Sequence, residues 1–151
     1  MKFALIALLV LFSPAFSFAA SISSVQTGAW SSAATWDAGV PKAGDRVTIT
    51  AGHIVAYDGQ SDAVVDGVDI YGTLKFSRSV STRLKTNDSI IVHGGGFLDM
   101  GTESDYIPNN VKVELIFVLP NGKTFTGTDQ FGNPHLAPAD TGLFVMPSAA
   151  S

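Results

Sequence analysis

The sequence predicts an all-β chain that forms a short right-handed parallel β-helix (solenoid) of about four coils, preceded by an N-terminal capping segment. After residue 20, no stretch shows the apolar periodicity of an amphipathic helix. Short β-branched runs bounded by Gly, Asn, Asp and Pro recur instead, and they repeat at a regular interval. A β-sandwich is the competing fold, but its strands follow one another roughly every 8 to 12 residues without glycines at fixed phases.

Residues 1–19 are predicted to be a secretory signal peptide. Lys2 gives a positive start, Phe3 to Phe12 is uninterrupted apolar sequence, and Ser17 and Ala19 supply the small residues for cleavage after Ala19. The apolar run is shorter than the roughly 20 residues that a bilayer-spanning helix needs. We therefore expect a secreted, extracellular protein, or a periplasmic one in a bacterium, with no membrane association after cleavage.

Composition narrows the class of partner. Removing 19 of the 151 residues leaves 132, enough for one domain with its own core. The formal net charge is −4 and the lysines and arginines do not cluster, which argues against nucleic acid as a partner. The chain has no cysteine, so core packing rather than disulfides has to hold it together.

Residues 20–46 are expected to form the N-terminal cap. The stretch from Gly28 to Asp45 is rich in Gly, Ser and Ala and contains Trp30 and Trp36. A repeat protein exposes its apolar interior at its ends, and large aromatic side chains can cover it. Trp36 is also a candidate ligand contact, because tryptophan rings can stack on the faces of sugars.

Residues 47–119 are predicted to form the β-helical coils. Four runs alternate apolar and other residues, and their second apolar positions are separated by 21, 22 and 21 residues. These positions are Ile49, Ile70, Val92 and Val113. A second run follows Gly52, Gly72 and Gly96, and a third, weaker apolar position follows at Val64–Val65, Leu84 and Tyr106. Three short strands in each repeat of about 21 residues are typical of a parallel β-helix.

The alternation within the first strand of each coil assigns its two faces. The expected inward residues are Val47, Ile49, Val68, Ile70, Ile90, Val92, Val111 and Val113. The expected outward residues are Thr48, Asp69, Ile91 and Lys112, with Thr50, Tyr71, His93 and Glu114 in the next column. Tyr71 and His93 are therefore candidate ligand contacts. Residues 120–151 are expected to be an irregular extension with one or two strands, one of which includes Leu143 to Met146.

The stretch GGGFLDMGTESDYIPNN, Gly94 to Asn110, is predicted to contain the bend of the third coil, in phase with the earlier glycines. Its acids lack the spacing of an EF-hand, so they are interpreted as turn formers, although a calcium site of another kind stays open. No cofactor motif is found, and no metal ligands are assigned.

Catalytic residues are not assigned either. His53 and His93 fall two coils apart and in different phases, His135 lies in the extension, and no Gly-x-Ser-x-Gly motif occurs. Most aspartates fall at turns, where Asp is favoured for its own hydrogen bonding. A small or truncated polysaccharide lyase or hydrolase remains the alternative from another class.

The order of these motifs resembles the eight-glycine, or G8, domain from about Gly28 to Phe117. The residues that carry the resemblance are Trp30, Thr35-Trp36, Pro41, Gly44-Asp45-x-Val47-x-Ile49, Gly52, Gly72-x-Leu74-x-Phe76, Ile90-x-Val92-x-Gly94-Gly95-x-Phe97-x-Asp99-x-Gly101-Thr102-Glu103 and Val111-x-Val113. The resemblance implies an extracellular β-rich module. In such relatives the module is joined to longer β-helical regions that this sequence does not show, so we expect a non-catalytic protein. The resemblance suggests a hyaluronan-like polysaccharide or an extracellular protein as partner, with end-to-end stacking on another β-helix as an open alternative.

Overall fold

The computed structural model describes residues 19–118, 125–128, 134–136 and 141–147. Within these residues the chain is all-β, and its one helical element is a 3₁₀ turn, η1 (Ala33–Thr35). The predicted fold class is therefore confirmed at this level. No helix in the described part of the chain is long and apolar enough to cross a bilayer. Apart from Ala19, the predicted signal peptide lies outside the described residues.

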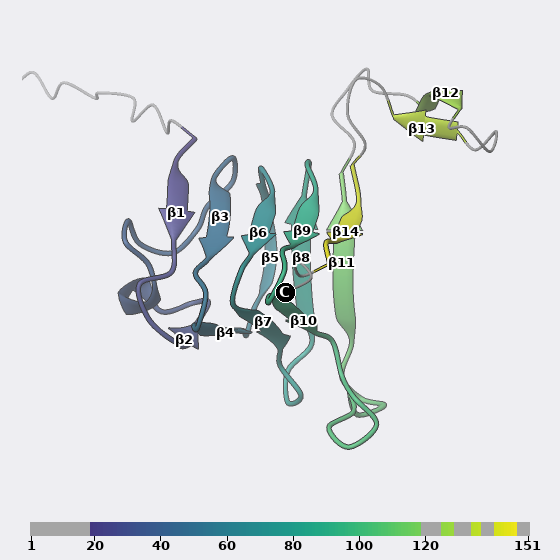
Figure 1. Ribbon diagram of the computed structural model, residues 1–151. Helices are drawn as coiled ribbons and strands as arrows, with labels where there is room; N and C mark the ends of the chain where they lie inside the picture. The colour runs from purple at the N-terminus through teal and green to yellow at the C-terminus, as the bar shows by residue number, and fades with distance from the viewer. Residues whose placement is uncertain (1–18, 119–124, 129–133, 137–140, 148–151) are drawn as a thin grey trace, which may run out of the picture.

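The strands form three sheets in which every pair is parallel, plus a separate two-stranded antiparallel pair (Figure 1). The first sheet contains β1 (Ser21–Ser23), β3 (Arg46–Ile49), β6 (Val68–Ile70), β9 (Ile90–Val92) and β14 (Leu143–Val145). The second contains β2 (Gly28–Ala29), β4 (Ile54–Tyr57), β7 (Thr73–Phe76) and β10 (Phe97–Asp99). The third contains β5 (Gln60–Val65), β8 (Thr82–Thr86) and β11 (Val113–Phe117), and the separate pair is β12 (Phe125–Thr128) with β13 (Pro134–Leu136).

The chain visits the three sheets in turn, so each pass contributes one strand to each sheet. The complete passes are β3–β5, β6–β8 and β9–β11. Strands of successive passes pair in register, with Val47 beside Val68 and Val68 beside Ile90. The predicted interval of 21 and 22 residues is thus the separation of neighbouring strands in the first sheet.

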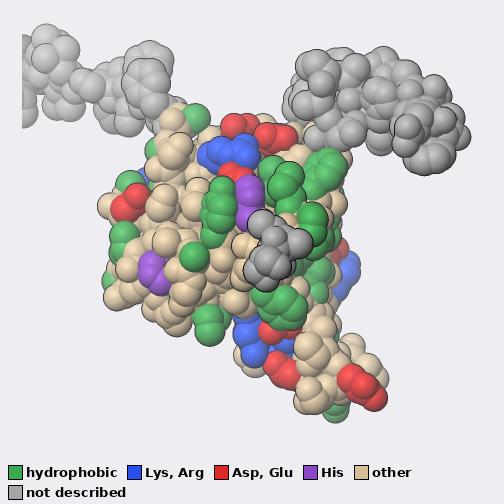
Figure 2. All heavy atoms as spheres, viewed as in Figure 1, with side chains coloured by type: hydrophobic (Ala, Val, Ile, Leu, Met, Phe, Trp, Pro, Cys, Tyr) green, Lys and Arg blue, Asp and Glu red, His purple; other side chains and the backbone are tan. Residues whose placement is uncertain are grey.

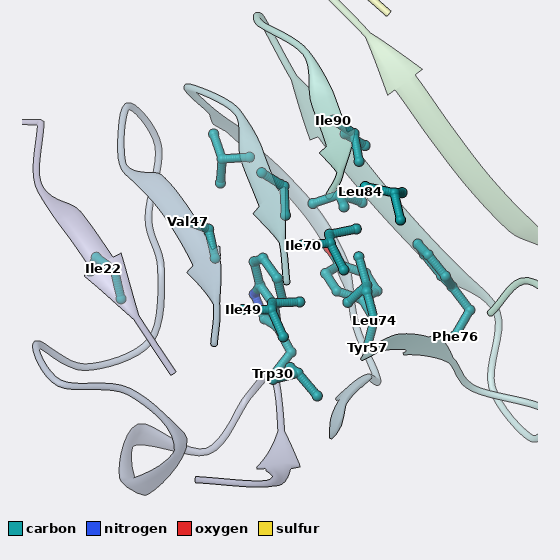
Figure 3. Close-up of a cluster of buried hydrophobic side chains, with 14 of the residues drawn as sticks. Ile22, Trp30, Val47, Ile49, Tyr57, Ile70, Leu74, Phe76, Leu84 and Ile90 are labelled. Atoms are coloured by element: carbon teal, nitrogen blue, oxygen red, sulfur yellow. The ribbon is translucent and has the colours of Figure 1, made fainter. Parts of the chain in front are cut away.

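The core lies between the three sheets (Figure 3). The six predicted inward residues of β3, β6 and β9 are all buried, with exposed fractions of 0 to 4%. From the second and third sheets, Leu74, Phe76 and Leu84 meet them, and each is at most 2% exposed. Burial of each such side chain contributes roughly 1.5–3 kcal/mol, which makes this apolar column the main stabilising feature of the fold.

The predicted capping segment also supplies strands. β1 and β2 pair with β3 and β4, so the segment adds one strand each to the first and second sheets. In the same segment, Trp30 packs edge-on against Trp36 and also against Tyr57 of β4, with ring centroids 4.9 Å apart in each pair. Burial, followed by the charge of Asp58, raises the pKa of Tyr57 to about 12.

The prediction that the run around Val113 belongs to the first sheet is wrong. Val111–Val113 was expected to start a fourth coil beside Val92, but β11 pairs with β8 in the third sheet, with Val113 beside Thr82. The third-sheet position expected at Tyr106 was also wrong, since Tyr106 lies in the loop before β11 and is 68% exposed. Lys112 and Glu114 therefore lie on the third sheet's side rather than beside His93.

The fourth neighbour of β9 comes from much later in the chain. β14 pairs with β9 so that Leu143 lies beside Ile90 and Val145 beside Val92. The expected strand from Leu143 to Met146 is confirmed, and the structure adds its place in the first sheet. The rest of the predicted extension includes β12 and β13, while residues 119–124, 129–133, 137–140 and 148–151 lie outside the described part.

Two of the phased glycines are required by close packing between passes. A Cβ atom on Gly72 would lie 2.4 Å from the carbonyl oxygens of Thr50 and His53, and one on Gly96 would lie 2.1 Å from the carbonyl oxygen of Ile70. Gly52, by contrast, is needed for its backbone conformation, with φ of 83°. The glycine phase in the sequence thus marks a corner where successive passes touch through their backbones.

Candidate functional site: the outer face of the first sheet

Tyr71 and His93 form a stacked pair on the outer face of the first sheet. Each follows a buried residue, Ile70 or Val92, and these two are aligned neighbours in β6 and β9. Alternation along a strand therefore turns both rings outward. The ring centroids are 4.0 Å apart and the planes are inclined by 8°, so the rings lie face to face. The sequence prediction placed these two candidates in one column, and the structure brings them into contact.

A carboxylate beneath the pair fixes the orientation of the imidazole. The Nε2 atom of His93 lies 2.9 Å from Oδ1 of Asp69, which can only accept, so Nε2 carries the donated hydrogen. The other carboxylate oxygen of Asp69 accepts a 2.9 Å hydrogen bond from Nε of Arg46. The Nη1 atom of Arg46 also donates to Asp88 over 3.1 Å. Arg46 thus holds the carboxylate of Asp69, and that carboxylate in turn orients the imidazole of His93.

Apolar side chains extend the stacked pair over three neighbouring strands. Phe144 aligns with the outward Ile91, and the backbone N–H of Met146 bonds to the carbonyl of Val92, which places Met146 next to His93 in the column. We call the set Tyr71, Ile91, His93, Phe144 and Met146 the outer platform. Tyr71 is 43%, Phe144 38% and Met146 50% exposed. Figure 2 shows hydrophobic side chains gathered around a histidine on this face, with charged side chains along one border.

Trp36, the third candidate, lies in the core and not on this surface. It is 4% exposed, and its indole N–H donates a 2.8 Å hydrogen bond to the carbonyl of Trp30. Its ring packs against Trp30 at the N-terminal end of the core. This position matches the capping role that the sequence also suggested.

The acids of the loop after β10 are held by two basic residues. Arg78 donates from Nη2 to Asp99 and from Nε to the carbonyl of Asp105, and Nζ of Lys75 lies 2.9 Å from Oδ2 of Asp105. Burial opposes ionisation of Asp99, yet the hydrogen bonds from Arg78 and Gly101 and the nearby positive charges hold its pKa below the ordinary value. A hydrogen bond from Lys75 lowers the pKa of Asp105 in the same way. These carboxylates therefore clasp the loop to the body of the protein.

No group of three or more His, Cys, Asp or Glu side chains is placed to hold a metal ion within the part of the chain that the structure describes. The oxygens of Asp99 and Asp105, which a calcium site would use, point instead at Arg78 and Lys75. The loop thus already has a structural use for its two aspartates.

His53 contacts a serine hydroxyl that supports a turn of the backbone. Nδ1 of His53 lies 2.9 Å from Oγ of Ser24, and the same oxygen accepts the backbone N–H of Thr50. Ser24 is only 3% exposed, so its hydroxyl does not face a substrate. His53 and His93 have different partners, as their phases predicted, and the side chain of His135 lies outside the described residues.

Asp69 and Asp99, the two aspartates whose substitution tests for a polysaccharide-degrading activity, lie on different sheets. Asp69 projects from the first sheet and binds Arg46 and His93, whereas Asp99 ends a strand of the second sheet and binds Arg78. A glycosidase needs two carboxyl groups on either side of one bond. Asp69 and Asp99 have no common partner in these contacts.

The sequence did not reveal Arg46, Phe144 or Met146 as parts of this face. Arg46 stands at the start of β3, and only the register places its guanidinium over Asp69 of the next pass. Phe144 and Met146 are more than 50 residues from His93 in the sequence. Only the short apolar run of Leu143 to Met146 signalled a strand, and it carried no information about the neighbouring strand.

The comparison with known families identifies the chain. The G8 domain model matches residues 35–146, which is most of the chain and includes the three complete passes and β14. No match was found among curated proteins or among solved structures. G8 domains form a family of non-catalytic modules of extracellular proteins. On the family match, together with the phased glycines and the parallel strands, this chain belongs to the G8 domain family.

Proposed function

We propose that this protein is a secreted, non-catalytic binding module whose outer platform holds an extracellular polysaccharide. The observation that carries the proposal is the stack of Tyr71, which is 43% exposed, on His93 at the outer face of the first sheet. Sugar rings present apolar C–H faces and polar edges, and aromatic side chains with a polar tip match both. An exposed apolar patch of this kind on a soluble protein commonly marks an interaction site.

The location of the platform supports the proposal. Strands in a sheet lie roughly 4.8 Å apart, so the neighbouring side chains at β6, β9 and β14 form a continuous surface. A surface of this shape suits a chain ligand that lies along it better than a small molecule, which needs a concave site. We infer further that the stacked passes form a right-handed parallel β-helix and that residues 1–19 direct export.

Glycan binding and turnover by residues 20–151 test the proposal together. We expect binding to at least one polysaccharide on a glycan array and no reducing-end or unsaturated products. Tyr71→Ala should weaken binding strongly, whereas Tyr106→Ala, which removes a 68% exposed tyrosine from the loop before β11, should leave it unchanged. Product formation that survives purification and is lost in Asp69→Asn or Asp99→Asn would favour the lyase or hydrolase alternative.

One observation favours a second candidate function, which is end-to-end stacking on another β-rich chain. Leu143 and Val145 align with buried residues of β9 but are 45% and 72% exposed themselves. Val113 and Phe117, by contrast, pack partly against the core. If stacking occurs, sedimentation equilibrium will show concentration-dependent association that Val145→Ser removes and Tyr71→Ala does not.

A further inference from the structure

We infer that the polysaccharide held on the outer platform is uncharged, so that neutral sugars bind and polyanions such as hyaluronan do not. This inference rests on the proposed function and names the ligand class of the same site. It departs from the hyaluronan-like partner that the family resemblance suggested. Three features of the described residues carry it: the pairing of the basic side chains, the charges at the border of the platform, and the hydrogen-bonding groups on its surface.

Almost all basic side chains in the described part of the chain are already neutralised by acids. Arg46 pairs with Asp69 and Asp88, Lys75 and Arg78 with Asp99 and Asp105, Arg83 with Asp62 and Glu114, Lys85 with Asp62, and Lys112 with Glu114. Lys42, before β3, is the one described basic side chain outside these pairs. Proteins that bind polyanions present clustered unpaired lysines and arginines, and these ranges show no such cluster.

The border of the platform carries more negative than positive charge. Arg46 is the basic residue there, and its guanidinium contacts two carboxylates, those of Asp69 and Asp88. Arg46 contributes one positive charge, and Asp69 and Asp88 contribute two negative charges. A uronate or sulfate placed on the platform would meet these two carboxylates, and the one cation there already contacts both of them. The local field therefore disfavours an anionic ligand.

The hydrogen-bonding groups on the platform suit hydroxyls. The Nε2 atom of His93 is occupied by Asp69 at 2.9 Å, which leaves Nδ1 as the ring's other hydrogen-bonding group. In the described residues no hydrogen bond reaches this Nδ1 or the hydroxyl of Tyr71. A sugar hydroxyl can both donate and accept a hydrogen bond, so it can pair with either group. The pair thus presents two hydrogen-bonding groups beside a stacking surface, which matches a neutral sugar.

Titration calorimetry with two ligand panels tests the inference on residues 20–151. The neutral panel contains cello-, xylo-, manno- and chito-oligosaccharides, and the anionic panel contains hyaluronan, polygalacturonate and chondroitin sulfate oligosaccharides. Each is titrated with and without added salt. We expect at least one neutral ligand to bind with an affinity that salt hardly changes, because no ions are released. Tyr71→Ala should weaken it roughly tenfold or more and Tyr71→Phe much less.

The outcomes separate this inference from the proposed function. Preferential binding of an anionic ligand, with affinity that falls as salt rises, would overturn the neutral-sugar assignment and leave a glycan-binding platform in place. Absence of binding to either panel would overturn both. Circular dichroism confirms that each variant is folded, and Tyr106→Ala serves as the matched control for loss of an exposed tyrosine.

Discussion

The two ends of the apolar core are covered to different extents. At the N-terminal end, Trp30, Trp36 and Tyr57 pack against one another and are 7%, 4% and 1% exposed. At the other end, Leu143 and Val145 continue the inward columns of the first sheet but remain 45% and 72% exposed. Inward-facing residues of the first sheet are therefore buried only where other strands or aromatic rings lie over them.

The last complete pass carries ion pairs that hold its long loop in place. Its long loop, between β10 and β11, is tied to the second sheet through Arg78, Lys75 and two aspartates. Ion pairs of this kind depend on pH and on every partner being present, whereas the aromatic cap depends on shape. The comparison teaches that the two ends should fail under different perturbations.

The largest expected effect is at the aromatic cap. Trp36→Ala leaves a cavity beside Trp30 and removes the hydrogen bond to its carbonyl, so we expect a loss of roughly 3–5 kcal/mol in the free energy of unfolding. Urea denaturation measures it. Val25→Ala, at a 54% exposed position, is the control and should change stability by less than about 0.5 kcal/mol. Similar losses in both variants would mean that the cap does not close the core.

The second largest effect is expected at the loop clasp, by which we mean the ion pairs of Lys75 and Arg78 with Asp99 and Asp105. Arg78 and Asp99 have side chains that are 15% and 10% exposed, so Arg78→Met leaves a largely buried carboxylate with Lys75 at 3.7 Å as its remaining cation. We expect a loss of about 3 kcal/mol and faster proteolysis near Tyr106. Lys112→Met, at an exposed pair with Glu114, should change neither quantity. Unchanged proteolysis in Arg78→Met would show that the loop is held by other contacts.

The corner glycines allow a matched pair of substitutions. Gly96→Ala places a Cβ atom 2.1 Å from the carbonyl oxygen of Ile70, so backbone must move, at a cost of roughly 1–3 kcal/mol. Gly59→Ala meets no atom within 4 Å and should be neutral or slightly stabilising. Thermal unfolding of both variants gives the comparison. Equal melting temperatures would remove the close approach between passes as the reason for these glycines.

Acid should loosen the clasp before it loosens the cap. The pKa values of Asp99 and Asp105 are lowered in the folded protein by Arg78 and Lys75, so their contribution is complete above the ordinary value of 3.8 and is lost as pH falls through the lowered values. Proteolysis near Tyr106 should accelerate below about pH 3.8 while the fluorescence of Trp30 and Trp36 stays native. Simultaneous loss of both signals would indicate one cooperative unit.

The smallest effect is expected at the open end. Val145→Ala should cost less than about 0.5 kcal/mol, because the side chain is already 72% exposed. Val92→Ala, at the aligned position of β9 and 4% exposed, should cost roughly 2 kcal/mol. Chemical denaturation at low protein concentration avoids any contribution from association. A large loss in Val145→Ala would mean that β14 is covered after all.

The first sheet could be predicted from the sequence because two periods coincide there. Alternation assigned Val68 and Ile70 inward and Asp69 and Tyr71 outward, and the interval of about 21 residues aligned them with their neighbours. The third sheet could not be predicted in full, since the run around Val113 has the same alternation as a first-sheet strand. Apolar alternation along a strand predicts which of its residues share a face, but it does not predict which other strand pairs with it.

The candidate site divides in the same way. The sequence placed Tyr71 and His93 in one outward column, but the contacts of Asp69 with Arg46 and His93 depend on side chains from three passes meeting at hydrogen-bond distance. Trp36 could not be separated into cap or ligand contact by sequence, because an aromatic residue suits both. Its 4% exposure settles where the ring lies.

The sequence by itself determined the all-β class, the repeat interval, the inward columns of β3, β6 and β9, and the corner glycines. These are local or periodic properties, written in side-chain type and spacing. Only the tertiary structure decided that β11 joins the third sheet, that β14 returns to the first, and that one end of the core is left open. Those outcomes depend on pairing between segments whose spacing follows no period, and therefore on how the clasped loop and the distant β14 can reach a strand edge.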